Sequence, residues 1–307
     1  MKDEILRRIE RELGVPDLAE RLGTRIQQAD LHSLLLEVFR RRASERTPAE
    51  VLADFASNRF VRPSTGDPRA LARFDAAAFA ALPGEFEAIE LSPVCPLGTS
   101  SVLGTVHQDK ALPSIRSVEV LSDATNVLAL ECAARRRKSP APVHLAASHR
   151  HLRTQLFQGP VSFAHFRLFV LCSAGRDSRE GRFHPSALDA HLRFYTELAR
   201  AFMGLGFALR VALSDLASET PRDVWRRSYP HAELVFDPNR ASGRGYYTDV
   251  CFKIHARASG GEWLELGDGG AVDWTRKLLS NAKERLVISG ISSERICALV
   301  AGATGRA

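Results

Sequence analysis

Several short segments of the chain contain charged residues of types that can bind ionic groups and take part in chemistry. Asp123 and Thr125 stand just before a predicted helix over 126–134. A carboxylate there can accept charge-assisted hydrogen bonds from an ammonium group, although aspartate before a helix is also an ordinary N-terminal cap. Arg153 follows a predicted strand over 143–148. A rigid bidentate cation of this kind can hold a carboxylate and a phosphate together while they react.

The second half of the chain holds two further candidate segments. Residues 243–252 contain Arg244 and the pair Tyr246 and Tyr247, and a glycine-rich turn is predicted over 267–273. Residues 288–296 are predicted to be a strand that turns into a helix beginning with Glu294 and Arg295. Each segment also has an ordinary explanation: core aromatics, a turn whose glycines relax the backbone, and a solvated ion pair.

The elements that must position these residues follow from hydrophobic periodicity. Residues 1–60 are predicted to be helical, with a capping box at Thr47–Glu50. Further along, strands are predicted over 86–91, 165–172, 207–213, 247–255, 263–266 and 286–289, with helices over 186–203 and from 293. Neighbouring strands joined by both hairpin-length and helical connections indicate an α+β fold with a largely antiparallel sheet flanked by helices. The loose stretch around Pro63, Gly66 and Pro68 suggests an N-terminal helical segment over 1–65 and a main domain over 66–307.

Composition limits the class of protein. The chain has 42 basic and 36 acidic residues, a net charge of +6 that permits an anionic partner without requiring one. The five cysteines form no CxxC pair, which predicts a reduced cytoplasmic protein without a zinc site. No apolar run approaches the roughly 20 residues needed to span a bilayer, so no membrane association is expected. Phosphate-loop, HExxH and GxSxG motifs are absent.

Two clusters of charge have competing interpretations. The run Arg135-Arg136-Arg137-Lys138 ends a predicted helix, where cations complement the helix dipole, and this is favoured over a nucleic-acid contact. His149 and His151 could form a metal pair. They supply only two ligands, however, and a structural site needs about four, so a solvated strand face is favoured and no metal-binding residues are predicted.

Taken in order, the four segments over about 115–300 resemble the catalytic core of class II aminoacyl-tRNA synthetases. The resemblance is to the histidyl type and to its paralogue, the regulatory subunit of ATP phosphoribosyltransferase. It implies ATP and Mg²⁺ as cofactors and a homodimer, with residues 86–93 as a candidate for the strand at the dimer interface. It leaves no room for an anticodon-binding domain after the core.

The resemblance also implies roles for individual residues. Arg153, Arg244 and Arg295 would be catalytic. The ATP site would consist of Arg153, Phe166, Glu294 and Arg295, with Phe166 stacked on adenine. The amino-acid site would consist of Asp123, Thr125, Leu168, Cys172, Tyr246, Tyr247, Gly269 and Gly270.

The chain departs from the family pattern where histidyl enzymes read the imidazole ring. The acid and the glutamine of that pocket fall at Cys172 and Leu168. Three functions are therefore open. The first is ATP-dependent activation of a non-histidine amino acid, for tRNA or another acceptor. The second is a non-catalytic protein that senses a metabolite. The third is an interaction module that retains only the dimer. The first is favoured narrowly.

Overall fold

The computed structural model describes residues 2–104, 106–155, 164–177, 181–217 and 232–304, together with 222, 225 and 229. The chain forms two compact units. The first comprises Met1–Arg62 with Pro113–Val118, and the second comprises Pro63–Leu112 with Glu119–Ala307.

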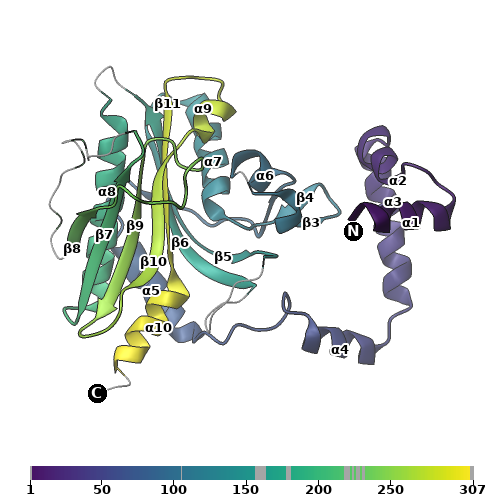
Figure 1. Cartoon of the computed structure of the whole chain (residues 1–307), viewed down its shortest axis with the longest axis horizontal. Helices are drawn as coiled ribbons and strands as arrows, with labels where there is room; N and C mark the ends of the chain where they lie inside the picture. Colours follow the sequence, from purple (N-terminus) through teal and green to yellow (C-terminus); the bar gives the residue numbers. More distant parts are fainter. Residues whose placement is uncertain are drawn as a thin grey trace. The chain divides into compact units, whose positions relative to one another are not determined.

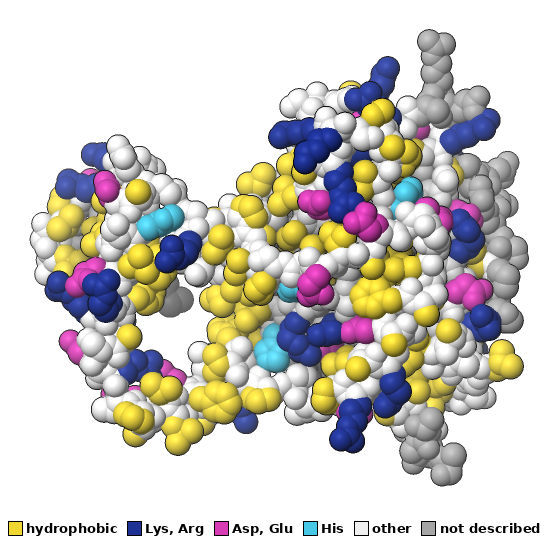
Figure 2. Space-filling model, turned by 180° about the vertical axis from the view of Figure 1, so that it is seen from behind, with side chains coloured by type: hydrophobic (Ala, Val, Ile, Leu, Met, Phe, Trp, Pro, Cys, Tyr) yellow, Lys and Arg dark blue, Asp and Glu magenta, His cyan; other side chains and the backbone are white. Residues whose placement is uncertain are grey.

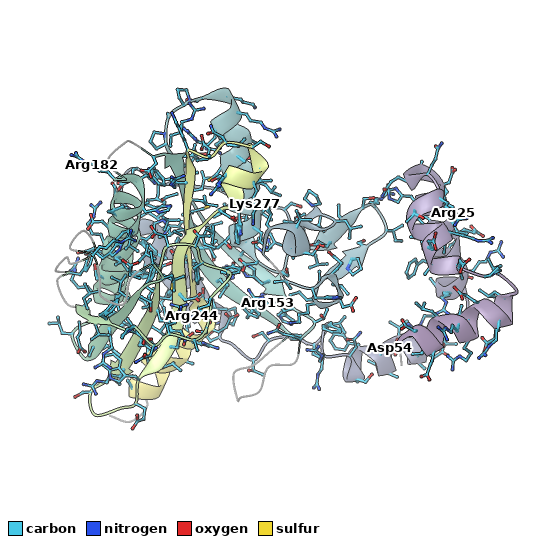
Figure 3. The ribbon with its side chains drawn as sticks, turned by 45° about the horizontal axis from the view of Figure 1, so that its top comes forward. Arg25, Asp54, Arg153, Arg182, Arg244 and Lys277 are labelled. Atoms are coloured by element: carbon cyan, nitrogen blue, oxygen red, sulfur yellow. The ribbon has the colours of Figure 1, made fainter. Side chains whose placement is uncertain are left out.

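The first unit is helical, as its periodicity predicts. It contains α1 (Lys2–Leu13), α2 (Leu18–Glu20), a π-helical turn (Arg21–Arg25), α3 (Gln28–Ser44) and α4 (Pro48–Ser57). The predicted capping box is present, since Thr47 Oγ1 accepts from the Glu50 nitrogen at 3.3 Å and Glu50 accepts from the Thr47 nitrogen at 2.7 Å. Charged side chains such as Arg25 and Asp54 lie on the surface (Figure 3), and hydrophobic side chains are exposed between them (Figure 2).

The second unit is built on an eight-stranded sheet of order β1-β5-β6-β11-β10-β9-β7-β8 (Figure 1). The strands are β1 (Glu87–Ala88), β5 (Val143–Leu152), β6 (His165–Arg176), β11 (Glu284–Ser292), β10 (Leu264–Val272), β9 (Val250–Ala258), β7 (Phe207–Asp215) and β8 (Ala232–Phe236). Only β1–β5 and β7–β8 are parallel among the described pairs. The predicted α+β fold with a mainly antiparallel sheet is confirmed.

Strand alternation divides the core into two layers. On β6, Phe169 and Leu171 pack into one cluster, with side chains from α5 (Pro68–Ala80), α8 (Phe183–Leu198) and α10 (Ser293–Thr304). Val170 and Cys172 pack into the other, with α7 (Ala124–Lys138) and α9 (Trp274–Leu278). The sheet is therefore covered by helices on both faces.

A small three-stranded sheet, β2 (Val94–Pro96), β4 (Val118–Val120) and β3 (Leu112–Ser114), precedes α7. The short helix α6 (Thr99–Leu103) and a 3-10 turn (Gln108–Lys110) belong to the same region. They are held by the buried Glu119, which accepts from the nitrogens of Gly98 and Ser100 and from Gln108 Nε2. Residues 86–93, the candidate interface strand, form only the two-residue strand β1.

Two local predictions were wrong. Residues 267–272 are not a turn but part of β10, hydrogen-bonded on both sides. The glycines permit close packing there, because a Cβ on Gly269 would lie 2.4 Å from the Ser289 Cβ. His149 and His151 do not lie on a solvated strand face, since both are buried. The basic run does end α7, as predicted, and within it Arg136 also forms a buried ion pair with Glu284 at 2.9 Å.

Candidate functional site

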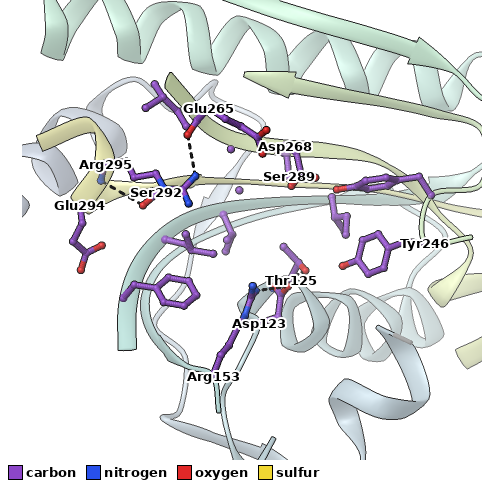
Figure 4. Close-up of a pocket in the computed structure, with 18 residues that line it drawn as sticks. Asp123, Thr125, Arg153, Tyr246, Glu265, Asp268, Ser289, Ser292, Glu294 and Arg295 are labelled. Atoms are coloured by element: carbon purple, nitrogen blue, oxygen red, sulfur yellow. Dashed lines mark hydrogen bonds and ion pairs between the residues drawn. The ribbon is translucent and has the colours of Figure 1, made fainter. Parts of the chain in front are cut away.

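One cavity of the second unit lies against β6, β10 and β11, beside the N-terminus of α7 (Figure 4). Its volume is about 230 Å³. Nine of the residues singled out from the sequence line it: Asp123, Thr125, Arg153, Phe166, Leu168, Tyr246, Tyr247, Glu294 and Arg295. The fold thus brings together residues that lie more than 170 positions apart in the chain.

Four candidates do not line this cavity. Cys172 is fully buried under α7 and packs in the same cluster as Cys132, and burial raises the pKa of its thiol. Gly269 and Gly270 pack against the neighbouring strands β9 and β11. Arg244 lies in the segment before β9, where its Nε donates to the Arg240 carbonyl at 3.0 Å.

Asp123 and Arg153 form the centre of the cavity wall. Arg153 Nη2 lies 3.2 Å from Asp123 Oδ2, and Arg153 Nε donates to the Ser122 carbonyl at 2.9 Å. The other carboxylate oxygen caps α7 by accepting from the nitrogen and hydroxyl of Thr125 at 3.0 and 2.7 Å. The Arg153 guanidinium also stands 5.1 Å from the centre of the Phe166 ring. A cation, an anion and an aromatic face are therefore arranged within one short stretch of wall.

His151 contacts both the first turn of α7, which Asp123 caps, and the ring of Phe166. Its Nε2 accepts a hydrogen bond from the Ala124 nitrogen at 2.8 Å, and its ring stacks on Phe166 with centroids 5.7 Å apart. Burial lowers the pKa of His151 to about 3, so the ring is neutral and can act as an acceptor. The sequence shows that His151 stands two residues before Arg153. It does not show that the His151 ring is buried.

The far end of the cavity is formed by the start of α10. Arg295 Nη1 donates to the Glu265 carbonyl at 3.0 Å (Figure 4). Glu294 accepts from the Arg167 nitrogen at 2.8 Å. Burial raises the pKa of Glu294. Glu265 belongs to β10 and was not anticipated as a wall residue.

Arg240 and Asp268 form a second cluster that was not anticipated, next to Tyr247. Arg240 Nη2 lies 3.1 Å from Asp268 Oδ2, and the guanidinium stands 5.4 Å from the centre of the Tyr247 ring. The Arg240 side chain is 2% exposed. Burial raises the pKa of Asp268, and Arg240 offsets part of this rise. The cation that lies over the Tyr247 ring is thus Arg240 and not Arg244, the arginine closest to the tyrosines in the sequence.

A neighbouring cavity of about 380 Å³ shares Asp123, Arg153, Tyr246, Tyr247 and Asp268 with the first. Its remaining wall includes Asn126, whose Oδ1 is buried without a hydrogen-bond partner among the described residues. The Asp123–Arg153 pair therefore lies on the wall common to both cavities. An unpaired buried acceptor favours a ligand group that donates a hydrogen bond.

Metal ligands do not gather in the described parts of the chain, where no group of three or more His, Cys, Asp or Glu residues could hold an ion. Within the same residues, none of the helices is both long and apolar enough to cross a bilayer.

The combination of this sheet with helices on both faces is the fold of class II aminoacyl-tRNA synthetases. The chain is similar to the histidyl-tRNA synthetase of S. aureus, with a TM-score of 0.55, 17% identity and coverage of 77% of this chain and 66% of that one. It is also similar to an ATP phosphoribosyltransferase regulatory subunit/histidyl-tRNA synthetase from Bacillus halodurans, with a TM-score of 0.57, 10% identity and coverage of 78% and 83%.

A third similar structure is the RNA binding domain of threonyl-tRNA synthetase from Cryptosporidium parvum, with a TM-score of 0.55, 13% identity and coverage of 77% and 64%. The chain thus spans less than two thirds of the histidyl and threonyl structures. No protein-family model matches the sequence, and no curated protein matches it. At these identities the likeness establishes the fold.

Proposed function

We propose that the chain activates an amino acid with ATP, forming an aminoacyl adenylate. One observation carries this proposal: Asp123, Arg153, Phe166 and Arg295, which such a reaction needs together, line a single cavity. Asp123 would bind the ammonium group, Arg153 would bridge the carboxylate and the α-phosphate, Phe166 would stack on the base, and Arg295 would meet the terminal phosphates.

In this reaction a carboxylate oxygen of the amino acid attacks the α-phosphorus of ATP. A bond forms between them, the bond to the bridging oxygen breaks, and pyrophosphate leaves. Arg153 would neutralise the two anions as they approach, which is electrostatic stabilisation of developing charge. Because its guanidinium is fixed by Ser122 and Asp123, little reorganisation is required.

Mg²⁺ fits this site as an ion held largely by ATP. It is usually bound by one or two carboxylates and substrate phosphates rather than by a cage of protein ligands. Glu265 and Glu294 line the cavity beside Arg295 and could supply such carboxylates. The ion would neutralise phosphate charge when bound.

The side-chain end of the cavity favours a small aliphatic amino acid over histidine. Leu168, Val170 and Ile288 form an apolar wall. The nearby polar groups are already engaged: Ser289 bonds His191 and Tyr195, and Asp268 bonds Arg240. An imidazole there would leave its nitrogens unpaired, at a cost of about 1–3 kcal/mol per group.

Pyrophosphate–ATP exchange, screened across the standard amino acids, tests the proposal. Exchange should depend on one small aliphatic amino acid and should be weak with histidine. Arg153→Gln should abolish it. If only histidine supports exchange, the pocket has been misassigned. If none of the standard amino acids supports exchange, activation by this chain is excluded.

The alternative function is a regulatory protein that senses an amino-acid-like ligand. It is favoured by one observation: Arg244, expected to be catalytic, does not line the cavity but donates to the Arg240 carbonyl. A sensor would bind its ligand equally well with and without ATP. Calorimetry with the amino-acid panel, read beside the exchange assay, separates this case, since a sensor binds an amino acid without supporting pyrophosphate–ATP exchange.

We propose further that the core is a cytoplasmic homodimer of the isologous kind, with a helical segment over 1–65 and the catalytic core over 66–307. The acceptor would be tRNA or another nucleophile. Light scattering at micromolar concentration tests the dimer, and a monomer there would count against it.

A further inference from the structure

The helices of the first unit carry large hydrophobic side chains that the unit itself does not cover. None of the residues of α2, α3 or α4 is buried. Most of the exposed large hydrophobic residues of the described chain belong to this unit: Ile5, Leu6, Leu13, Ile26, Leu34, Leu36, Val38, Phe39, Val51, Leu52, Phe55 and Val61. Helices shorter than about 12–15 residues are marginal without tertiary packing, and α4 has 10 residues. A partner surface is therefore needed to stabilise these helices.

The charges of the unit indicate what kind of partner this is. Residues 1–62 contain twelve basic and eleven acidic residues, so the segment is nearly neutral. Several arginines are already paired, Arg40 and Arg41 with Glu37 and Arg46 with Asp54. A nucleic acid or an anionic membrane selects a surface with excess positive charge. A protein surface with apolar side chains and charges of both signs fits better.

One ridge of α3 is complementary to itself. Asp30, Leu34, Val38 and Arg42 follow one another at intervals of four residues, and all four are exposed. Residues at this spacing form one of the ridges by which helices pack. Read in reverse, the ridge places base opposite acid and apolar opposite apolar. Asp30 and Arg42 form no ion pair among the residues that the structure describes.

We propose that α3 packs antiparallel against α3 of a second copy of the chain through this ridge. Leu34 of one copy then lies opposite Val38 of the other, and Asp30 lies opposite Arg42. Because the contact is twofold, each pair occurs twice. Phe39, which is 54% exposed, flanks the ridge and adds apolar area.

The connection to the second unit allows such pairing. Residues 58–67 lie between the end of α4 and the start of α5 and contain neither helix nor strand. Ten extended residues span up to about 33–36 Å. The first unit also contains Pro113–Val118, and these residues leave the four ridge positions of α3 exposed.

A charge-reversal cycle in the full chain tests the proposal. Asp30→Arg and Arg42→Asp should each weaken self-association about tenfold in low salt, because an attractive pair becomes repulsive at two places. The double variant should recover to within about threefold of wild type. Both substitutions oppose the helix dipole, so recovery cannot come from a more stable isolated helix. Sedimentation equilibrium measures the dissociation constant.

Amide hydrogen exchange over residues 28–44 gives a local readout that does not depend on core dimerisation. Protection should increase with protein concentration and should be lost in Val38→Asp. The matched control is Leu205→Asp, at a position in the second unit that is 88% exposed, and it should leave α3 protected. A double charge variant as weak as the singles would refute the pairing. Amide protection of α3 that does not depend on protein concentration would also refute the pairing. Another part of the same chain would then cover the helix.

Discussion

The ring of His151 accepts a hydrogen bond from the backbone nitrogen of Ala124 at 2.8 Å. This bond ties strand β5 to the first turn of α7, the turn that presents Asp123 and Thr125 to the cavity. It satisfies a nitrogen at the helix N-terminus that has no partner within the helix. Because only a neutral imidazole can accept here, the geometry of the site depends on His151 remaining unprotonated.

Acid should therefore destabilise the protein before its carboxylates titrate. Burial lowers the pKa values of His151 and His191 to about 3, against an ordinary value of 6.5. Between these values the unfolded chain binds more protons than the folded one, so stability falls as pH decreases from about 6.5 toward 3, by at most about 1.4 kcal/mol per pH unit for each histidine. Urea unfolding at pH 7.5, 6 and 5 measures this slope.

A pair of variants assigns the acid effect to the buried ring. His151→Gln keeps a side-chain acceptor but cannot titrate, so its stability should depend less steeply on pH. His107 has a side chain that is 73% exposed, and His107→Gln should leave the slope unchanged. Equal slopes in all three proteins would show that His151 is not the group responsible.

Arg153→Gln should remove the thermal stabilisation by ATP with Mg²⁺ while leaving the apo protein folded. The ion pair of Arg153 with Asp123 has side chains that are 31% and 24% exposed, so its loss should cost no more than about 1–2 kcal/mol. Ligand binding raises the melting temperature by linkage, and differential scanning fluorimetry measures it. Arg193→Gln, on the surface of α8, is the control. An ATP shift retained in Arg153→Gln would exclude the phosphate role.

Arg136→Ala should destabilise the second unit severely, whereas Arg137→Ala should not. Arg136 and Glu284 have side chains that are 0% and 1% exposed, and removing one partner of a buried pair typically costs about 3–5 kcal/mol. Arg137 is exposed, and its Nη2 donates to the Leu278 carbonyl at 3.3 Å. Denaturant unfolding of the two variants gives the difference, and similar midpoints would contradict the assignment.

The Arg136–Glu284 pair also has a pH signature. Burial raises the pKa of Glu284, but hydrogen bonds from Arg136 and Arg176 outweigh this effect and hold the pKa below its usual value of 4.5. The contribution of Glu284 to stability is therefore present above pH 4.5 and is lost as the pH falls through the lowered value.

The sequence predicted the positions of strands and helices better than it predicted which of their side chains other elements cover or contact. Periodicity indicates which side of β6 faces inward, and Phe166, Leu168 and Val170 do line the cavity. Cys172 continues the same alternation, yet α7 covers it, because the helix crosses one end of the strand and leaves the other open. Likewise, Arg240 was overlooked because its approach to Asp268 joins residues 28 positions apart, which local spacing does not encode.

Val170 and Cys172 allow a direct test of where the amino-acid pocket ends. Both lie on the same face of β6, but only Val170 lines the cavity, while Cys172 is enclosed with Cys132. Val170→Ala should enlarge the pocket and shift the preference toward a longer aliphatic side chain, because one or two methyl groups change affinity by about 1–3 kcal/mol. Cys172→Ala should reduce stability modestly through a small internal cavity and leave the preference unchanged. Calorimetry with alanine, valine, leucine and histidine measures both variants. If Cys172→Ala changed the preference while Val170→Ala did not, the ligand would lie deeper along β6 than the cavity indicates.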